Sequence, residues 1–349
     1  MFYNILMSNE YRNEQDIRNN TKINELLNNM PEFLEDFHTH LDSRNRSTNT
    51  ILGYMYEINV FLRFMAVALK KENITDIQVT DLDKIRMTQI EKYIAESEDG
   101  IKLSETARRR KLSVLKTMYK YYLAIGAIKN NPTLLVEGPK LHERDVVKLS
   151  DSEVSALLNC IQNQDKISEH AKAYNKRMVD RDMAIIMVLL GTGMRVSELV
   201  GLNLSDIDTT EEHKVYFSIV RKGGDYDKVR VITPVYNAVA DYIEFSRPLL
   251  LSSTDENALF ISTQGKRISV NAVQKMLKKY CKATGLSDKY SPHKMRATFA
   301  TKVYAETKDI YAIKDALHHS NIDTSKHYIS DKEARIDAAA EAASTFFSY

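Results

Sequence analysis

The chain has 349 residues, and at roughly 150 residues per domain this length predicts two domains. Hydrophobic residues make up 43% and charged residues 28% of the sequence, a composition that excludes disorder as the main state. The 49 lysines and arginines outnumber the 47 aspartates and glutamates by only two, so the net charge alone does not indicate a nucleic-acid partner. With 11 glycines and 6 prolines the chain has few turn residues, which disfavours an all-β fold and favours long helices.

The apolar segments and the cysteines predict a cytoplasmic protein with no membrane partner. The longest apolar run, Met183–Leu190, is far shorter than the roughly 20 residues that a membrane span needs. The N-terminus has no basic and apolar signal-peptide pattern. Cys160 and Cys281 show no metal-ligand spacing, and a chain of this length needs no disulfide to fold, so a reducing compartment and no metal are expected.

The first third of the chain predicts a polar extension followed by helices. Residues 1–30 are rich in asparagine, and we expect a weakly ordered extension with one short helix near Ile23–Leu27. The N-cap residues of Arg46–Thr50 precede an apolar stripe that runs to Met65, which predicts an amphipathic helix. A second helix is predicted over Asp83–Ala95.

A third helix is predicted to begin near Ser104 and to carry a basic face. Between residues 101 and 140 there are nine lysines and arginines but only two acidic residues. The apolar side chains of this helix share one face, and a basic stripe lies about 100° away, as expected of a helix that lies against DNA. A solvated helix face explains the same pattern equally well. The candidate DNA contacts are Arg108, Arg109, Lys116 and Lys120.

The domain boundary is predicted in the irregular stretch that ends near residue 148. Asn131-Pro132 and Gly138-Pro139 interrupt the helical pattern there, and a capping box at Ser150–Glu153 opens a new helix. We therefore expect a helical domain over residues 31–140, whose basic helix makes it a candidate DNA-binding domain, and a linker at 141–148. A second domain follows over residues 149–330, with a C-terminal tail at 331–349.

One β-hairpin is predicted within the mainly helical second domain. Apolar side chains alternate over Lys214–Val220 and again over Lys228–Thr233, as in half-buried strands. Arg221–Asp227 contains glycines and is expected to form the turn between them.

Three short segments of the second domain carry chemically versatile side chains. The glycines of Gly191–Gly193 end an apolar helix and place Arg195 at the start of the next one. Pro292 starts a further helix on which His293 and Arg296 are three residues apart, on one face. Taken singly, such residues are more often ion-pair partners or surface groups than catalysts.

Taken together and in this order, these segments resemble the tyrosine recombinases, the integrase family that includes phage integrases and bacterial Xer recombinases. Thr192–Leu199 resembles the first arginine box of the family, and Arg221–Gly223 its lysine turn. His293–Arg296 matches the second box, and His319 stands nine residues before Tyr328, as the last histidine does before the family's nucleophile. The resemblance covers roughly residues 31–349. It implies a mostly α, multi-domain protein: a helical, SAM-like core-binding domain and a mixed α/β catalytic domain with a small β-hairpin sheet.

The resemblance also implies a mechanism that needs neither metal nor cofactor. Tyr328 would attack a DNA phosphodiester, giving a 3′-phosphotyrosine and a free 5′-hydroxyl. Arg195 and Arg296 would hold the non-bridging oxygens as permanently charged, planar forks. His293 would assist removal of the tyrosine proton, since a phenol with a pKa near 10 is a poor nucleophile. His319 would donate a hydrogen bond to the scissile phosphate.

In the remaining role, Lys222 would protonate the leaving 5′-oxygen. The turn that follows it is longer than usual in the family, so Lys228 is a second candidate for this role. His318 stands where the family usually has a small residue, although the spacing favours His319 as the phosphate ligand. Ala297 replaces a histidine that often follows the second arginine.

The implied partner is double-stranded DNA, bound by a homotetramer on two sites that exchanges strands through a Holliday junction. By the same resemblance, the tail at residues 331–349 would pack on a neighbouring protomer. Two alternatives remain open from the residues: a type IB topoisomerase that relaxes DNA as a monomer, and a DNA-binding module that has lost catalysis. The tail beyond Tyr328 disfavours the first, and the complete set of six catalytic residues disfavours the second.

Overall fold

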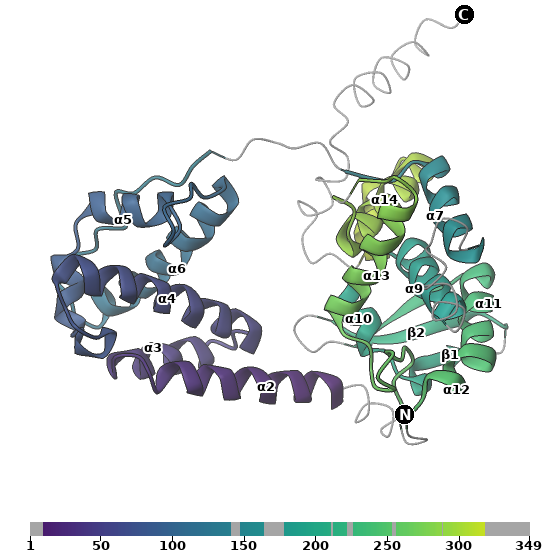
Figure 1. The fold of residues 1–349 in the computed structure, drawn as a ribbon, viewed down its shortest axis with the longest axis horizontal. Helices are drawn as coiled ribbons and strands as arrows, with labels where there is room; N and C mark the ends of the chain where they lie inside the picture. The colour runs from purple at the N-terminus through teal and green to yellow at the C-terminus, as the bar shows by residue number, and fades with distance from the viewer. Residues whose placement is uncertain are drawn as a thin grey trace, which may run out of the picture. The chain divides into compact units, whose positions relative to one another are not determined.

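The computed structural model describes residues 10–140, 147–163, 178–210, 212–221, 226–252, 256–287 and 289–317. The chain forms two compact units, of which the N-terminal one comprises Tyr11–Glu143 and the C-terminal one continues from residue 144. Helices dominate both units (Figure 1), so the predicted mostly α class is confirmed.

The N-terminal unit consists of helices around one apolar core. Its α-helices are α2 (Glu10–Leu27), α3 (Phe33–Asp42), α4 (Thr48–Leu69), α5 (Met87–Ala95) and α6 (Glu105–Ala124), and its short 3-10 helices are η1 (Ile74–Asp76) and η2 (Val79–Lys84). Aromatic rings fill the centre, where Phe37, Phe61 and Tyr119 are fully buried. The Tyr122 hydroxyl donates to the Phe33 carbonyl oxygen at 2.7 Å, so that this buried phenol remains hydrogen-bonded as burial requires.

Helix α4 lies at the centre of this unit and follows the predicted pattern. Ser47 is its extended N-cap, and the apolar stripe from Ile51 to Met65 is buried. By length and mean hydropathy alone α4 is apolar enough to cross a membrane. Its buried face instead packs within the unit, against α3 and α6, as expected for the core helix of a globular domain.

The N-terminal segment is more ordered than its composition predicts. Where we expected a weak extension with a helix near Ile23–Leu27, α2 is a helix of 18 residues. Ile23 on α2 is fully buried, and the Asn19 amide donates to Thr48 Oγ1 at 3.0 Å and to Asn49 Oδ1 at 2.9 Å. The partly buried Leu26 and Leu27 also pack on the core, and Asp16 accepts a hydrogen bond from Thr48. These apolar contacts are confined to the last turns of α2, so no apolar period runs along the whole helix.

The second predicted helix, over Asp83–Ala95, begins later than expected. The structure has the 3-10 helix η2 up to Lys84 and then starts α5 at Met87. Gln89 Oε1 accepts a hydrogen bond from the Arg86 backbone N–H at 2.9 Å. Glutamine is usual at this position of a capping box, but arginine is not a usual N-cap residue, so the sequence does not mark the start of α5 clearly. Helix α6, by contrast, begins as predicted, with Ser104 Oγ accepting from the Ala107 N–H.

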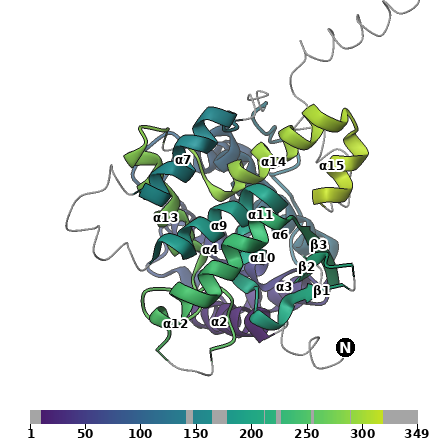
Figure 2. The same ribbon diagram turned by 90° about the vertical axis from the view of Figure 1, so that its right-hand side faces the viewer.

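The C-terminal unit surrounds one buried helix with further helices and a small sheet (Figure 2). Its α-helices are α7 (Asp151–Asn163), α9 (Val179–Thr192), α10 (Val196–Gly201), α11 (Thr233–Asp241), α12 (Arg247–Leu250), α13 (Val270–Ala283), α14 (Pro292–Thr307) and α15 (Ile310–Leu317). Between them lie the 3-10 helix η4 (Leu204–Asp206) and the π-helix η5 (Tyr242–Ser246). Helix α9 is apolar around most of its circumference and packs against α7, α11 and α14, which makes it the core of this unit.

The sheet has three antiparallel strands in the order β1-β2-β3: β1 (Ile207–Thr209), β2 (Val215–Val220) and β3 (Tyr226–Val231). The predicted hairpin is confirmed as β2 and β3, paired from Val215↔Val231 to Val220↔Tyr226. On β2, Val215, Phe217 and Ile219 are buried in alternation. Strand β1 was not predicted, because three residues are too few to show an alternating pattern.

The docking of α2 can be tested by truncating its buried side chain. Ile23→Ala removes apolar atoms from a closed site, so we expect it to lower the free energy of unfolding by about 2–5 kcal/mol. Ile17→Ala on the same helix is the control, because Ile17 is 66% exposed and should change stability by less than about 0.5 kcal/mol. Urea denaturation of the full chain measures both. Equal effects of the two variants would show that α2 is not docked through Ile23.

Candidate active site and basic groove

Arg195 lies at the junction between α9 and α10, where a glycine ends one helix and a capping box starts the next. Gly193 has a left-handed backbone conformation, with φ at +63°. Glu198 Oε2 accepts from the Arg195 backbone N–H at 2.6 Å, and its Oε1 accepts from Arg195 Nη1 at 2.9 Å. The Glu198 carboxylate therefore caps α10 and orients the Arg195 guanidinium. The side chain of Arg195 is 39% exposed.

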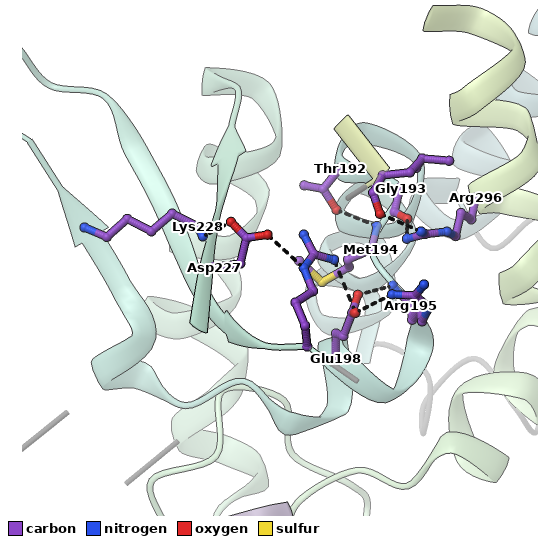
Figure 3. A network of polar contacts seen from close by, with 10 residues as sticks. Thr192, Gly193, Met194, Arg195, Glu198, Asp227, Lys228 and Arg296 are labelled. Atoms are coloured by element: carbon purple, nitrogen blue, oxygen red, sulfur yellow. Dashed lines mark hydrogen bonds and ion pairs between the residues drawn. The ribbon is translucent and has the colours of Figure 1, made fainter. Parts of the chain in front are cut away.

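Arg296 on α14 binds the same junction from the other side. Its Nη1 donates to the Gly193 carbonyl oxygen at 2.6 Å, and its Nη2 donates to the Leu317 carbonyl oxygen at 2.8 Å. The residue is only 2% exposed. One guanidinium thus joins the end of α9 and the end of α15, and it brings the two predicted arginine segments together (Figure 3).

Gly193 is required at this junction for two reasons. Its positive φ is unfavourable for residues with a side chain. A Cβ atom at this position would also lie 2.3 Å from Phe299 Cδ1 and 2.8 Å from Leu317 Cδ2, far inside van der Waals contact. The absence of a side chain therefore allows α14 to approach the end of α9.

His293 occupies the exposed first turn of α14, one turn before Arg296. Partial removal of the imidazole from water lowers its pKa below the ordinary 6.5, and the positive charges of Lys294, Arg296 and Arg195 lower it further. Because each of these effects disfavours the imidazolium, His293 is neutral at pH 7 and able to accept a proton. The structure therefore brings three of the predicted catalytic residues into one electrostatic environment.

Glu198 also binds a second arginine, Arg221, which directly follows β2. Arg221 Nη1 donates to Glu198 Oε1 at 3.2 Å, and Arg221 Nε donates to Asp227 Oδ2 at 3.1 Å. The side chains of Glu198 and Arg221 are 4% and 9% exposed. A carboxylate with so little access to water needs nearby positive charge, and the two guanidinium groups provide it.

Three predicted catalytic residues, Lys222, His319 and Tyr328, lie outside the described part of the chain, as do His318 and the tail at 331–349. The alternative lysine, Lys228, is described. Its side chain extends away from Arg195 (Figure 3) and forms an ion pair with Asp208. Ala297 is buried in α14.

A basic groove runs along α6 in the N-terminal unit, with a volume of about 440 Å³. Its basic lining residues are Arg44, Arg46, Arg109, Lys116 and Lys120. The three on α6 were predicted, and they recur at the spacing of one helix face. Arg108 is half-buried and is not among the groove residues found in the described chain. The hydroxyls of Ser113 and Thr117 complete a surface suited to phosphate groups.

Sequence reasoning missed three residues of these sites or gave them no role: Arg44, Arg46 and Arg221. Arg44 and Arg46 precede α4 and reach the groove only because α4 packs on α6. Arg221 was assigned only to a turn. Glu198 was expected to brace Arg195 or the neighbouring backbone without a catalytic role, and its two contacts with Arg195 confirm this. A signal existed for Glu198, since a glutamate three residues after an N-cap position is the pattern of a capping box.

Comparison with known proteins identifies the family of the chain. Residues 141–335 match the model of the phage integrase family, and residues 34–126 match the phage integrase N-terminal SAM-like domain. The chain belongs to the phage integrase family. It is similar to the tyrosine recombinase XerC of Caldanaerobacter subterraneus subsp. tengcongensis, with 32% identity over 320 residues that cover 87% of this chain and 85% of the relative. A XerD from Halalkalibacterium halodurans is 28% identical over 313 residues, covering 88% of this chain and 95% of the relative.

Solved structures of integrase-family recombinases share the fold. XerH bound to its difH substrate in a pre-cleavage complex matches with a TM-score of 0.63 at 19% identity, over 92% of this chain and 87% of that one. A lambda integrase dimer on a COC′ core site matches with a TM-score of 0.61 at 18% identity, over 86% and 77% of the two chains. The predicted activity is confirmed at the level of the family: the chain is a site-specific recombinase that breaks and rejoins DNA. Neither the topoisomerase nor the inactive module is supported.

The electrostatic coupling of His293 to the arginines can be measured by NMR titration of its imidazole. We expect an apparent pKa below 6.5. Arg195→Ala should raise this pKa, because it removes a positive charge that disfavours the imidazolium. Arg230→Ala, a loss of the same charge on β3, is the control and should leave it unchanged. An imidazole pKa at or above 6.5, or one insensitive to Arg195, would contradict this electrostatic environment.

Proposed function

We propose that this recombinase cuts each DNA strand with Tyr328, contacts the scissile phosphate through Arg195, and stabilises its charge through the buried guanidinium of Arg296. The observation that carries the proposal is the convergence of Arg195, Arg296 and His293, from α10 and α14, at the Gly193 junction. Two guanidinium charges placed before reaction stabilise the negative charge that develops on a pentavalent phosphorus. The exposed part of Arg195 is available for direct contact with the non-bridging oxygens.

Arg296 acts in this proposal both through its charge and as an anchor. Its bond to the Leu317 carbonyl fixes the point at which the chain leaves α15. Two residues later comes His319, which we assign to the scissile phosphate. The buried guanidinium thus supplies positive potential and defines where the histidine segment begins.

The proposed proton transfers match the charge states at the site. The Tyr328 oxygen attacks phosphorus, the bond from phosphorus to the 5′-oxygen breaks, and the phenolic proton passes to neutral His293. Lys222 gives a proton to the leaving 5′-oxygen. The 5′-hydroxyl of the partner strand then attacks the phosphotyrosine in the reverse chemistry, which rejoins the DNA through a Holliday junction. The ester to Tyr328 conserves the bond energy, so the exchange needs no external energy source.

Lys222 is the better candidate for the acid than Lys228. Lys228 Nζ forms an ion pair with Asp208. Its side chain extends away from Arg195 (Figure 3). Lys222 follows Arg221, whose guanidinium is bound to the same carboxylate as Arg195. The proton donor is therefore assigned to the residue adjacent to the site.

We further propose that the chain acts in the cytoplasm on double-stranded DNA as a homotetramer. Two duplexes present four strands to be cut, and each strand needs one Tyr328. The tail at 331–349 would join neighbouring protomers by exchange. The basic groove along α6 supports DNA as the partner, as do the DNA-bound XerH and lambda integrase structures that share the fold.

Tyr328→Phe tests the proposed nucleophile. Because only the hydroxyl that forms the ester is removed, we expect unchanged DNA affinity but no covalent protein–DNA adduct. The substrate is a nicked duplex carrying a site recovered by sequencing DNA fragments covalently attached to the wild-type protein. Denaturing gels report the adduct and gel shifts report affinity. An adduct that persists in this variant would assign the nucleophile elsewhere, with Tyr304 and Tyr311 as the next candidates.

Charge reversal in the groove tests the DNA-binding surface. Arg109→Glu and Lys116→Glu should each weaken binding to specific and unrelated duplexes alike and reduce the slope of log affinity against log salt by about one, as loss of a phosphate contact does. Lys92→Glu is the control, because Lys92 is exposed on α5 outside the groove. Fluorescence anisotropy at several salt concentrations measures the slopes. A loss confined to one base position, with the slope unchanged, would indicate base recognition instead.

A further inference from the structure

Arg221 has no role in the proposed chemistry, yet its guanidinium is buried beside the site. Its Nη1 binds Glu198 Oε1, and its Nε binds Asp227 Oδ2. Glu198 in turn binds both the backbone and the guanidinium of Arg195. A continuous chain of charge-assisted hydrogen bonds therefore runs from the phosphate-binding arginine, through one carboxylate, to the β2–β3 hairpin.

These contacts lie at both ends of the hairpin turn. Arg221 directly follows β2, and Asp227 lies on β3. The Arg221 guanidinium therefore connects the end of β2 with the start of β3. It also binds both to Glu198 on α10. The next residue after Arg221 is Lys222.

We propose that Arg221 is a positioning residue that holds the hairpin against Glu198, so that Lys222 meets the leaving 5′-oxygen. The inference rests on the proposed role of Lys222 as the proton donor. Through Glu198, the same contact ties the lysine segment to the guanidinium that holds the phosphate. The buried Glu198 carboxylate thereby positions both Lys222, the proton donor, and Arg195, which binds the phosphate that is attacked.

An arginine suits this task better than a lysine. Its planar fork directs Nη1 to one carboxylate and Nε to another at fixed geometry, whereas an ammonium group is a point charge on a flexible stem. Burial strengthens both contacts, because the effective dielectric constant is lower than in water. Arg221→Lys is therefore expected to retain charge but lose part of the positioning.

The test compares cleavage of ordinary DNA with cleavage of a 5′-bridging phosphorothioate, whose sulfur leaves without protonation. Single-turnover rates are measured on the nicked duplex described above, made with oxygen or sulfur at the scissile bond. Arg221→Ala should slow cleavage of the oxygen substrate by about tenfold or more, yet cleave the sulfur substrate within about threefold of wild type. Asp227→Asn, which leaves the Glu198 contact in place, should show a smaller effect with the same rescue.

Two controls separate this inference from the proposed function. Lys222→Ala, measured in parallel, reports the proton donor: rescue by sulfur supports that role, and lack of rescue overturns both the role and the inference built on it. Arg230→Ala removes an arginine of the same hairpin that binds the Val215 and Val231 carbonyls instead of Glu198. Its ratio of sulfur to oxygen rates should equal that of wild type.

The inference is overturned if Lys222→Ala is rescued while Arg221→Ala is slowed equally on both substrates, or not slowed on either. Equal slowing would mean that Arg221 only stabilises the fold or acts through Arg195. Should Arg221→Ala fold poorly, Arg221→Lys and Asp227→Asn carry the same comparison, and an unchanged sulfur-to-oxygen ratio in both would likewise overturn it.

Discussion

The catalytic unit depends on the guanidinium of Arg296, which binds the carbonyl oxygens of Gly193 and Leu317. These two carbonyls come from segments more than 100 residues apart in the chain. They belong to the ends of two helices, where carbonyl groups lack partners within the helix. A buried guanidinium requires several acceptors to offset its desolvation. The contact therefore satisfies the backbone and the side chain together, and it places a permanent positive charge beside Arg195 and His293.

A second buried charge, Glu198, complements the first. Its carboxylate caps α10, orients Arg195 and binds Arg221. The local balance of charge is then set by fixed groups. The pKa of His293 is lowered first by partial removal of the imidazole from water and then by the positive charges around it. The acid–base state of the site thus follows from the same contacts that hold its helices together.

The sequence was sufficient to predict those elements whose formation depends on residues close together in the chain. The apolar stripe of α4, the start of α6 at Ser104 and the alternation in β2 and β3 are local patterns, and the structure contains each of them. The capping box before α7 is also present, with the Ser150 N–H donating to Glu153 Oε2 at 2.8 Å. Arg195 and Arg296 could be selected because ordered, spaced motifs carry information that single residues lack.

Contacts between segments far apart in the chain could not be predicted from such local patterns. Nothing local marks Arg44 and Arg46 as neighbours of α6, or the Leu317 carbonyl as a partner of Arg296. The polar docking of α2 depends on Asn19 and Asp16, which contact Thr48, and both stand in a run of polar residues where no pattern distinguishes them. Each of these features arises from tertiary packing, which no helical or strand period encodes.

The close approach of Phe299 to Gly193 has a consequence for the precision of the site. The spacing between α9 and α14 is set there by a hydrogen atom instead of a side chain. An added methyl group would force the Phe299 and Leu317 side chains, or α14 itself, to shift. Any shift of α14 would carry His293 and Arg296 with it. In-line displacement at phosphorus tolerates little such error, since a misplacement of about 1 Å can reduce a rate about a hundredfold. The close packing at Gly193 therefore links the positions of His293 and Arg296 to the end of α9.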